Sequence, residues 1–378
     1  MTAPKPFAVA WHAAHVGKVL EQVRAYPWPP APEVDDGWAY GCDADYLHRL
    51  CDHWLDGYDW RAAVHDLNRY PQFTARIEDF DIHFVHVIGE AEGRRPLILS
   101  HGWPGSHFEF WDAIDKLAWP SRHGGDAADA FDLVIPSLPG FGFSPQRPSF
   151  ADAQQTHELW HRLMREELGF ERYGGHGGDL GAGITSRLAE AYPAEVVGIH
   201  LLAAGPVGYD AASLTPEEQT YLEEVSVWQQ QEGGYQHEQG TRPLTLGYGL
   251  ADSPAGLLAW ILEKYRAWSD CGGEVSTRFS DDFLLTQASL YWFTETISTS
   301  FRPYYEYATG MTRRVERVEV PTALALFPAD LSHPPRSWVE RTYRLVRYTR
   351  MPRGGHFAPH EEPELLAADL TEFFRALR

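Results

Sequence analysis

The sequence HGGDLGAGI at residues 176–184 carries the pattern Gly-x-Asp-x-Gly, in which Asp179 lies between Gly177 and Gly181. A sharp turn from a strand into a helix holds its central residue in a strained conformation and needs small residues on both sides. The same pattern taken alone is more often a helix N-cap, because Asp is a favoured capping residue. The interpretation of Asp179 as an exposed nucleophile therefore depends on what the rest of the chain places around it.

Short apolar runs alternate with helical stretches on both sides of this turn. The runs are IHFVHVI from Ile82, PLILS at 96–100, DLVIPS at 132–137, VVGIHLL at 196–202, PTALALF at 321–327 and RLVRYTR at 344–350. Such alternation is typical of a mostly parallel sheet with helices on both faces. The sequence therefore predicts an α/β fold.

Changes in the residue pattern divide the 378 residues into four predicted segments. Residues 1–80 are rich in Trp and Tyr at helical spacing and predict a helical lead-in, and residues 81–205 predict the first part of the α/β core. Residues 206–310 lose the strand pattern and predict a helical cap, after which residues 311–378 return to strands and end in an amphipathic helix. The predicted core is therefore interrupted by an insertion and then completed.

Composition and charge restrict the class of protein. The chain has 32 Lys and Arg against 53 Asp and Glu, a formal net charge of -21 that disfavours nucleic acid and anionic lipids as partners. Its three cysteines lack CxxC spacing, which favours a reducing cytoplasm over a disulfide framework or a zinc site. No apolar run reaches the length of a membrane span and no signal peptide is evident, so we expect a soluble, unexported protein.

A second loop supports the nucleophile interpretation. The sequence HGWPGS at residues 101–106 follows the apolar run PLILS directly. A loop at this place can aim a backbone N–H at the nucleophile, and the N–H of the residue after the nucleophile supplies a second donor. The predicted oxyanion hole therefore consists of the main-chain N–H groups of Trp103 and Leu180, although a simple Pro-Gly turn is the alternative.

The order of acidic and basic residues gives the third argument. Asp179 is followed by Asp330, just after the run PTALALF, and then by His356, after the run RLVRYTR. A nucleophile, an acid and a histidine in this order, each at the end of a strand, form a catalytic triad at the carboxyl edge of a sheet. Either residue alone is more often a surface side chain, but the three placements together favour a triad.

A carboxylate nucleophile predicts a particular chemistry. Asp has a reference pKa near 3.9 and is already ionised at neutral pH, so Asp179 can attack an sp³ carbon without a base. The product is an ester of the enzyme itself, and a base is needed only to hydrolyse it. We expect His356 to activate water for that step and Asp330 to orient its imidazole.

With these residues in place, the chain resembles the microsomal-type epoxide hydrolases and their soluble bacterial relatives over nearly its whole length. Besides HGWPGS, GGDLG and RGGHF, the shared phrases are WAYG, YDWR, LNRYPQF, IHFVHV, DSPAGLLAWILEKY and TISTSFRPYYE. The resemblance implies an α/β-hydrolase fold with an N-terminal region of the epoxide hydrolase type. It also implies conversion of an epoxide and water to a vicinal diol, without a cofactor or a metal.

The resemblance further implies two cap tyrosines that bind and protonate the epoxide oxygen. By position these are Tyr235 in GGYQHEQ and Tyr304 in SFRPYYE. A phenol with a reference pKa near 10 is a neutral donor at pH 7 that can yield its proton to an alkoxide. Packing tyrosines are the alternative in so aromatic a segment, and the neighbouring Tyr248 and Tyr305 leave the assignment of Tyr235 more open than that of Tyr304.

One departure from the family bears on the alternatives. Where the family has Trp after the nucleophile, this chain has Leu180, so a haloalkane-type dehalogenase, which needs side-chain N–H donors for halide, is the less favoured enzyme. An esterase is disfavoured because Ser186 lacks flanking glycines. A non-catalytic ligand-binding homologue stays as the alternative outside the enzymes.

The expected partners are a small-molecule epoxide and water, with no nucleic acid and no membrane span. An aryl or natural-product epoxide is compatible with the aromatic residues of the insertion. Assembly as a homodimer is left open beside a monomer.

Overall fold

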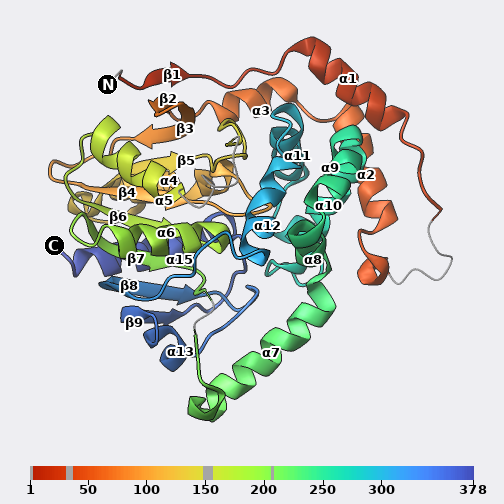
Figure 1. Cartoon of the computed structure of the whole chain (residues 1–378). Coiled ribbons are helices and arrows are strands. Elements are labelled where there is room, and N and C mark those ends of the chain that lie inside the picture. Colours follow the sequence, from red (N-terminus) through yellow and green to blue (C-terminus); the bar gives the residue numbers. More distant parts are fainter. Residues whose placement is uncertain (1–2, 31–36, 148–155, 206–207) are drawn as a thin grey trace.

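The computed structural model describes residues 3–30, 37–147, 156–205 and 208–378 (Figure 1). A nine-stranded sheet runs through it in the order β1-β2-β3-β5-β4-β6-β7-β8-β9. The strands are β1 (Lys5–Phe7), β2 (Gln72–Ile77), β3 (Phe80–Val87), β4 (Arg95–Ser100), β5 (Phe131–Pro136), β6 (Tyr173–Gly177), β7 (Val196–Leu201), β8 (Val318–Leu326) and β9 (Tyr343–Arg350). The six strands from β5 to β9 pair in parallel, and β1 to β3 add antiparallel pairs at one edge.

Helices cover both faces of this sheet and extend beyond it. They are α1 (Ala13–Arg24), α2 (Ala44–Asp56), α3 (Trp60–Leu67), α4 (Trp111–Ala118), α5 (Thr156–Arg162), α6 (Asp179–Ala191), α7 (Pro216–Glu232), α8 (Gly234–Thr241), α9 (Pro243–Asp252), α10 (Pro254–Ala267), α11 (Asp281–Phe293), α12 (Arg302–Ala308), α13 (Arg336–Glu340), α14 (Ala358–Glu361) and α15 (Pro363–Arg375). The predicted α/β fold with a mostly parallel sheet is confirmed.

The central strand β6 has the sequence YGGHG, which is poor in residues that favour strands. A Cβ at Gly174 would come within 2.5 Å of the ring of Phe374 on α15, and one at Gly175 within 2.9 Å of Thr185 on α6. Both helices therefore pack directly on the strand backbone, and larger side chains would push them away. Close packing on both faces explains why this strand lacks the usual β-branched residues.

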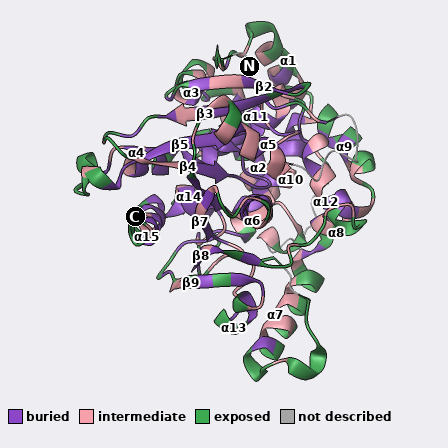
Figure 2. Ribbon diagram, turned by 60° about the vertical axis from the view of Figure 1, so that its left-hand side comes forward, coloured by how far each residue is buried: buried purple, intermediate pink, exposed green. Residues whose placement is uncertain are grey.

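A helical insertion, α7 to α12, lies between β7 and β8. Figure 1 shows α8 to α12 gathered at one end of the sheet, while the first turn of α7 pairs through Glu218 with Arg341 at the end of α13. Figure 2 shows buried residues on the central strands and mainly exposed or half-exposed residues along α7. The insertion thus covers the end of the sheet where β4 and β6 finish.

The N-terminal helices pack against this insertion. The hydroxyl of Tyr58, between α2 and α3, lies 2.8 Å from that of Thr286 on α11, and Arg49 on α2 pairs with Asp281 at the start of α11. The lead-in therefore supports the insertion from the side opposite the sheet. Among the described residues, none of the helices combines the length and the apolar composition that crossing a bilayer requires.

Candidate active site

The turn between β6 and α6 holds Asp179 in a left-handed conformation, with a φ of 46°. L-residues rarely adopt this region, although Asp tolerates it better than most. A Cβ at Gly181 would lie 2.0 Å from the carbonyl oxygen of Ser100 on β4, and a Cβ at Gly177 would lie 2.3 Å from the carbonyl oxygen of Gly181. The two glycines of the motif are therefore required by close backbone contacts.

Two backbone N–H groups hold the carboxylate of Asp179. The N–H of Trp103 donates to Oδ1 over 2.9 Å, and the N–H of Leu180 also donates to this carboxylate. Burial raises the pKa of Asp179, whereas the positive charge of His356 and these two N–H groups favour its ionised form. The two loops predicted to approach each other do so, and both donors point at the same side chain.

A histidine faces the other carboxylate oxygen. The Nε2 atom of His356 lies 3.9 Å from Oδ2 of Asp179, and its Nδ1 lies 2.7 Å from Oδ1 of Asp330. An isolated parallel bridge between Ala329 and Gly355 joins the loops that carry the acid and the base. The structure therefore brings together the three residues that chain order suggested.

The charges around His356 set its protonation state. Burial opposes a charge on the ring, but the carboxylates of Asp330 and Asp179 outweigh burial and raise the pKa of His356 to about 9. The ring of His356 is therefore protonated at neutral pH. A change that neutralises Asp179 will lower the pKa of His356, so that more of the imidazole is unprotonated and free to accept a proton.

Two tyrosines from the helical insertion lie above this group. Tyr235 on α8 and Tyr304 on α12 have ring centroids 5.9 Å apart, and each packs against the indole of Trp103, at 5.4 and 5.9 Å between centroids. Burial and the nearby charge of Asp179 raise the pKa of both phenols above their usual value. Both hydroxyls are therefore neutral donors, whereas Tyr248 is largely exposed to solvent.

A small cavity adjoins Asp179 and is not lined by these tyrosines, and we call it the inner cavity. It has a volume of about 10 Å³ for the centre of a water molecule, which is room for about one water. Its walls are Gly102, Trp103, Gly105, Glu109, Phe110, His176, Gly178, Asp179, Leu202, His356, Phe357 and Pro359. Asp179 and His356 both contribute to the lining of this cavity.

Sequence reasoning missed Glu109, which lies at this cavity. It belongs to the short helix His107–Phe110 that follows the HGWPGS loop. Burial raises the pKa of Glu109 to about 8, with the charge of His356 acting against burial and that of Asp179 adding to it. The carboxyl group is therefore protonated at neutral pH and can donate a hydrogen bond. A Glu five residues after the loop's Pro104 was the only signal in the sequence.

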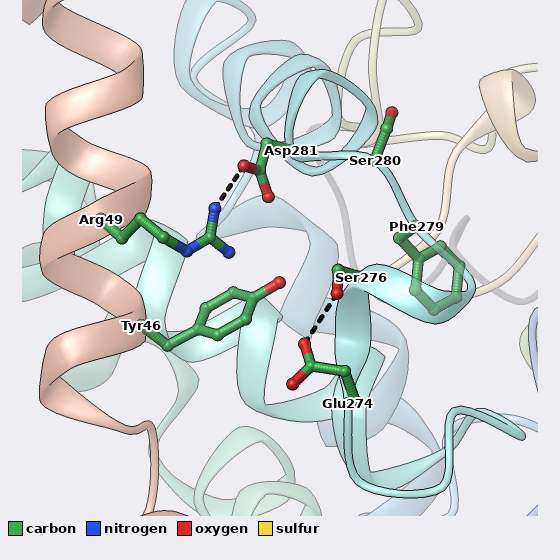
Figure 3. Close-up of a pocket in the computed structure, with 7 residues that line it drawn as sticks. All are labelled: Tyr46, Arg49, Glu274, Ser276, Phe279, Ser280 and Asp281. Carbon is green, nitrogen blue, oxygen red and sulfur yellow. Dashed lines mark hydrogen bonds and ion pairs between the residues drawn. The ribbon is translucent and has the colours of Figure 1, made fainter.

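A wider pocket of about 480 Å³ lies elsewhere, between α2 and the segment before α11 (Figure 3). Its polar side chains pair with one another: Arg49 with Asp281, and the hydroxyl of Ser276 with Glu274 over 2.7 Å. Among the residues that line this pocket there is no histidine and no strained turn like that of Asp179. The chemistry therefore belongs to the smaller, enclosed site.

Among residues 3–30, 37–147, 156–205 and 208–378, no three His, Cys, Asp or Glu side chains are arranged to hold a metal ion. The site lies in an α/β-hydrolase fold and centres on a carboxylate, Asp179, that faces a histidine.

Comparisons with known proteins identify the family within that class. Residues 4–110 match the family described as "Epoxide hydrolase N terminus", and residues 95–239 match the "alpha/beta hydrolase fold". The chain is 35% identical to epoxide hydrolase 1 of Sus scrofa, over 99% of this chain and 89% of that protein. It belongs to the epoxide hydrolase family and is an enzyme of that family.

Solved structures agree with this assignment. The structure of Aspergillus niger epoxide hydrolase is similar at a TM-score of 0.87 and 31% identity, covering 100% of this chain and 97% of that one. The juvenile hormone epoxide hydrolase of the silkworm Bombyx mori is similar at a TM-score of 0.89 and 32% identity, covering 100% and 95%. The fold of the whole chain, including its helical insertion, is therefore that of these enzymes.

Proposed function

We propose that this epoxide hydrolase works through a covalent ester on Asp179. The observation that carries the proposal is that the two oxygens of this carboxylate have different partners. The N–H of Trp103 donates to Oδ1, and His356 faces Oδ2. Oδ2 is then the atom that attacks an epoxide carbon. Oδ1 becomes the ester carbonyl, already seated among backbone donors.

Ring opening is the first step. Oδ2 of Asp179 attacks one epoxide carbon and the C–O bond of the ring breaks, so that negative charge develops on the epoxide oxygen. The hydroxyls of Tyr235 and Tyr304 donate hydrogen bonds to this oxygen, and one of them yields its proton to the alkoxide. Their burial in the aromatic cluster around Trp103 supports this role, because a dry site strengthens each hydrogen bond.

Ester hydrolysis is the second step. Once Asp179 is an ester its charge is gone, so the pKa of His356 falls and the imidazolium gives its proton back to the tyrosine that lost one. The imidazole is then a base at neutral pH, and it regains a proton from the Asp179 carboxyl group after hydrolysis. Water in the inner cavity gives one proton to Nε2 and attacks the ester carbon, and negative charge forms on Oδ1, facing the two N–H donors. Collapse releases the diol, and the same proton passes from His356 to the diol oxygen.

The aromatic walls bear on the substrate class. Trp103, Trp268 and Phe301 meet around the two tyrosines, with ring centroids 6.1 Å from Trp103 to each of the other two. Such a surface favours a flat or apolar substituent on the epoxide. We propose an aryl epoxide, with water as the second substrate.

Labelled water tests the mechanism. In a single turnover of styrene oxide in heavy-oxygen water, the first diol should be unlabelled and the label should enter Asp179. A His356→Gln protein should form the ester and fail to release it, which intact-mass measurement detects as a mass increase equal to that of the epoxide. Label found directly in the first diol would exclude the ester.

A further inference from the structure

One wall of the inner cavity is a histidine that the proposed mechanism leaves unused. His176 on β6 is fully buried and lines this cavity. Its Nδ1 lies 3.1 Å from Nδ1 of His200 on the neighbouring strand β7. Its Nε2 is buried and has no hydrogen-bond partner among the described residues. Such an atom next to a space for one water is a candidate water ligand.

A hydrogen-bonded chain connects this ring to α15. Nε2 of His200 lies 3.0 Å from Oδ2 of Asp369, and the other carboxylate oxygen accepts hydrogen bonds from Arg347 and Thr349 at 2.6 to 2.8 Å. Although burial opposes its ionisation, the hydrogen bonds from His200, Arg347 and Thr349 hold the pKa of Asp369 well below its usual range. The chain therefore ends on a carboxylate that only accepts hydrogen bonds.

This carboxylate fixes the positions of the protons on both rings. Because Asp369 accepts, Nε2 of His200 carries an N–H, and we infer that this is the only proton on the ring, which leaves Nδ1 as an acceptor. The N–H of His176 must in turn be on Nδ1, the atom that faces His200. Burial holds the pKa of His176 well below its usual value, so its ring stays neutral. Its Nε2 consequently presents a lone pair to the cavity.

A water that attacks an ester needs two acceptors for its two protons, so that its lone pair is free to point at the carbon. His356 is one acceptor, since it removes the proton that leaves. We propose that His176 is the second: it positions the hydrolytic water by accepting a hydrogen bond from the O–H that stays on the attacking oxygen. The inference rests on the proposed ester mechanism and adds a positioning residue to its second step.

The bonding changes balance without His176 gaining or losing a proton. One O–H bond of the water breaks and its proton goes to His356, while the oxygen forms a bond to Cγ of Asp179. The second O–H bond remains intact and hydrogen-bonded to Nε2 of His176. Glu109, protonated at neutral pH, can donate to the water's other lone pair. Ring opening uses none of these contacts, so only ester hydrolysis depends on His176.

Two variants of His176 distinguish the effect of its hydrogen-bond acceptor from the effect of the volume of its ring. His176→Phe removes the lone pair and keeps a ring of similar size, whereas His176→Gln restores an acceptor oxygen. Single turnovers of styrene oxide, quenched and followed by intact mass, give the rate constants of ester formation and of ester hydrolysis separately. In His176→Phe we expect ester formation within about twofold of wild type and hydrolysis slowed about tenfold or more. His176→Gln should recover most of the lost rate.

His86→Phe is the matched control. His86 on β3 also has a buried Nε2 without a partner among the described residues, but it does not line the inner cavity. Its variant should form and hydrolyse the ester at wild-type rates. Nitrogen-15 NMR of the wild-type protein gives a second readout that does not depend on any variant folding. It should show a protonated Nδ1 and a bare Nε2 for His176.

Three results would overturn the inference. They are an unchanged hydrolysis rate in His176→Phe, an equal slowing of both steps, which is the mark of a structural role, and an N–H on Nε2 of His176. Failure of the underlying mechanism looks different. In that case neither the wild type nor His356→Gln would form an ester at all.

Discussion

In the proposed mechanism, the negative charge of Asp179 decides when His356 can act as a base. Removing that charge should lower the pKa of His356, and the distance between the two groups gives the size of the effect. Nε2 of His356 lies 3.9 Å from Oδ2 of Asp179. At an effective dielectric constant of about 20, two unit charges at that distance attract by about 4 kcal/mol, or about 3 pKa units. Replacing Asp179 by Ala removes the negative charge, as ester formation does. The pKa of His356, about 9 in the intact site, should then fall towards about 6.

Histidine NMR measures this shift directly. The signal of His356 is identified by its loss in His356→Gln, and its titration is followed in the wild type and in Asp179→Ala. Asp112→Ala is the control, because Asp112 pairs with a different histidine, His360, over 2.8 Å. The control should leave the midpoint of His356 unchanged. A midpoint that stays above about 8 in Asp179→Ala would refute the argument that alkylation switches the base on.

Three further predictions concern the backbone turn, the acid donors and the orienting carboxylate. Gly181→Ala places a Cβ 2.0 Å from a main-chain oxygen and should lower the free energy of unfolding, measured in urea, by about 3 kcal/mol or more. The control is Gly183→Ala on the same helix, where the added Cβ lies 3.6 Å from its nearest neighbour. This change should be neutral or should raise the free energy of unfolding by up to about 1 kcal/mol. Tyr304→Phe should slow ester formation about a hundredfold with little effect on ester hydrolysis, measured in single turnovers. Asp330→Asn should lower the pKa of His356 and slow hydrolysis about a thousandfold or more, so that the ester accumulates, because the imidazole loses its orienting anion.

The strand ends and the order of Asp179, Asp330 and His356 could be predicted from sequence because each lies next to a short apolar run. Chain order and strand ends are local features, and the geometry of a parallel sheet then brings them together. The paired backbone donors at Trp103 and Leu180 follow from the same rule. These features needed no knowledge of side-chain packing.

The inner cavity could not be predicted in this way. Glu109 and His176 reach it from different segments, and the pairing of His176 with His200 depends on the register between β6 and β7. Strand β6 is poor in residues that favour strands, and only the close packing of α6 and α15 on its backbone explains that composition. In each case the feature depends on contacts between residues far apart in sequence, and no local sequence pattern predicts such contacts.

The place of the helical insertion has a consequence for how the protein becomes active during synthesis. Asp179 precedes the insertion, whereas Asp330 and His356 follow it, in the loops after β8 and β9. A ribosome therefore finishes β4, β6 and β7 while the chain still lacks the strands that carry the base. Asp179 can be folded into its turn early, but a partly made chain has nothing to release an alkylated carboxylate. On the proposed mechanism, an Asp179 alkylated at that stage stays an ester until His356 has been made and folded into place, so completion of the C-terminal segment is also what restores the alkylated residue.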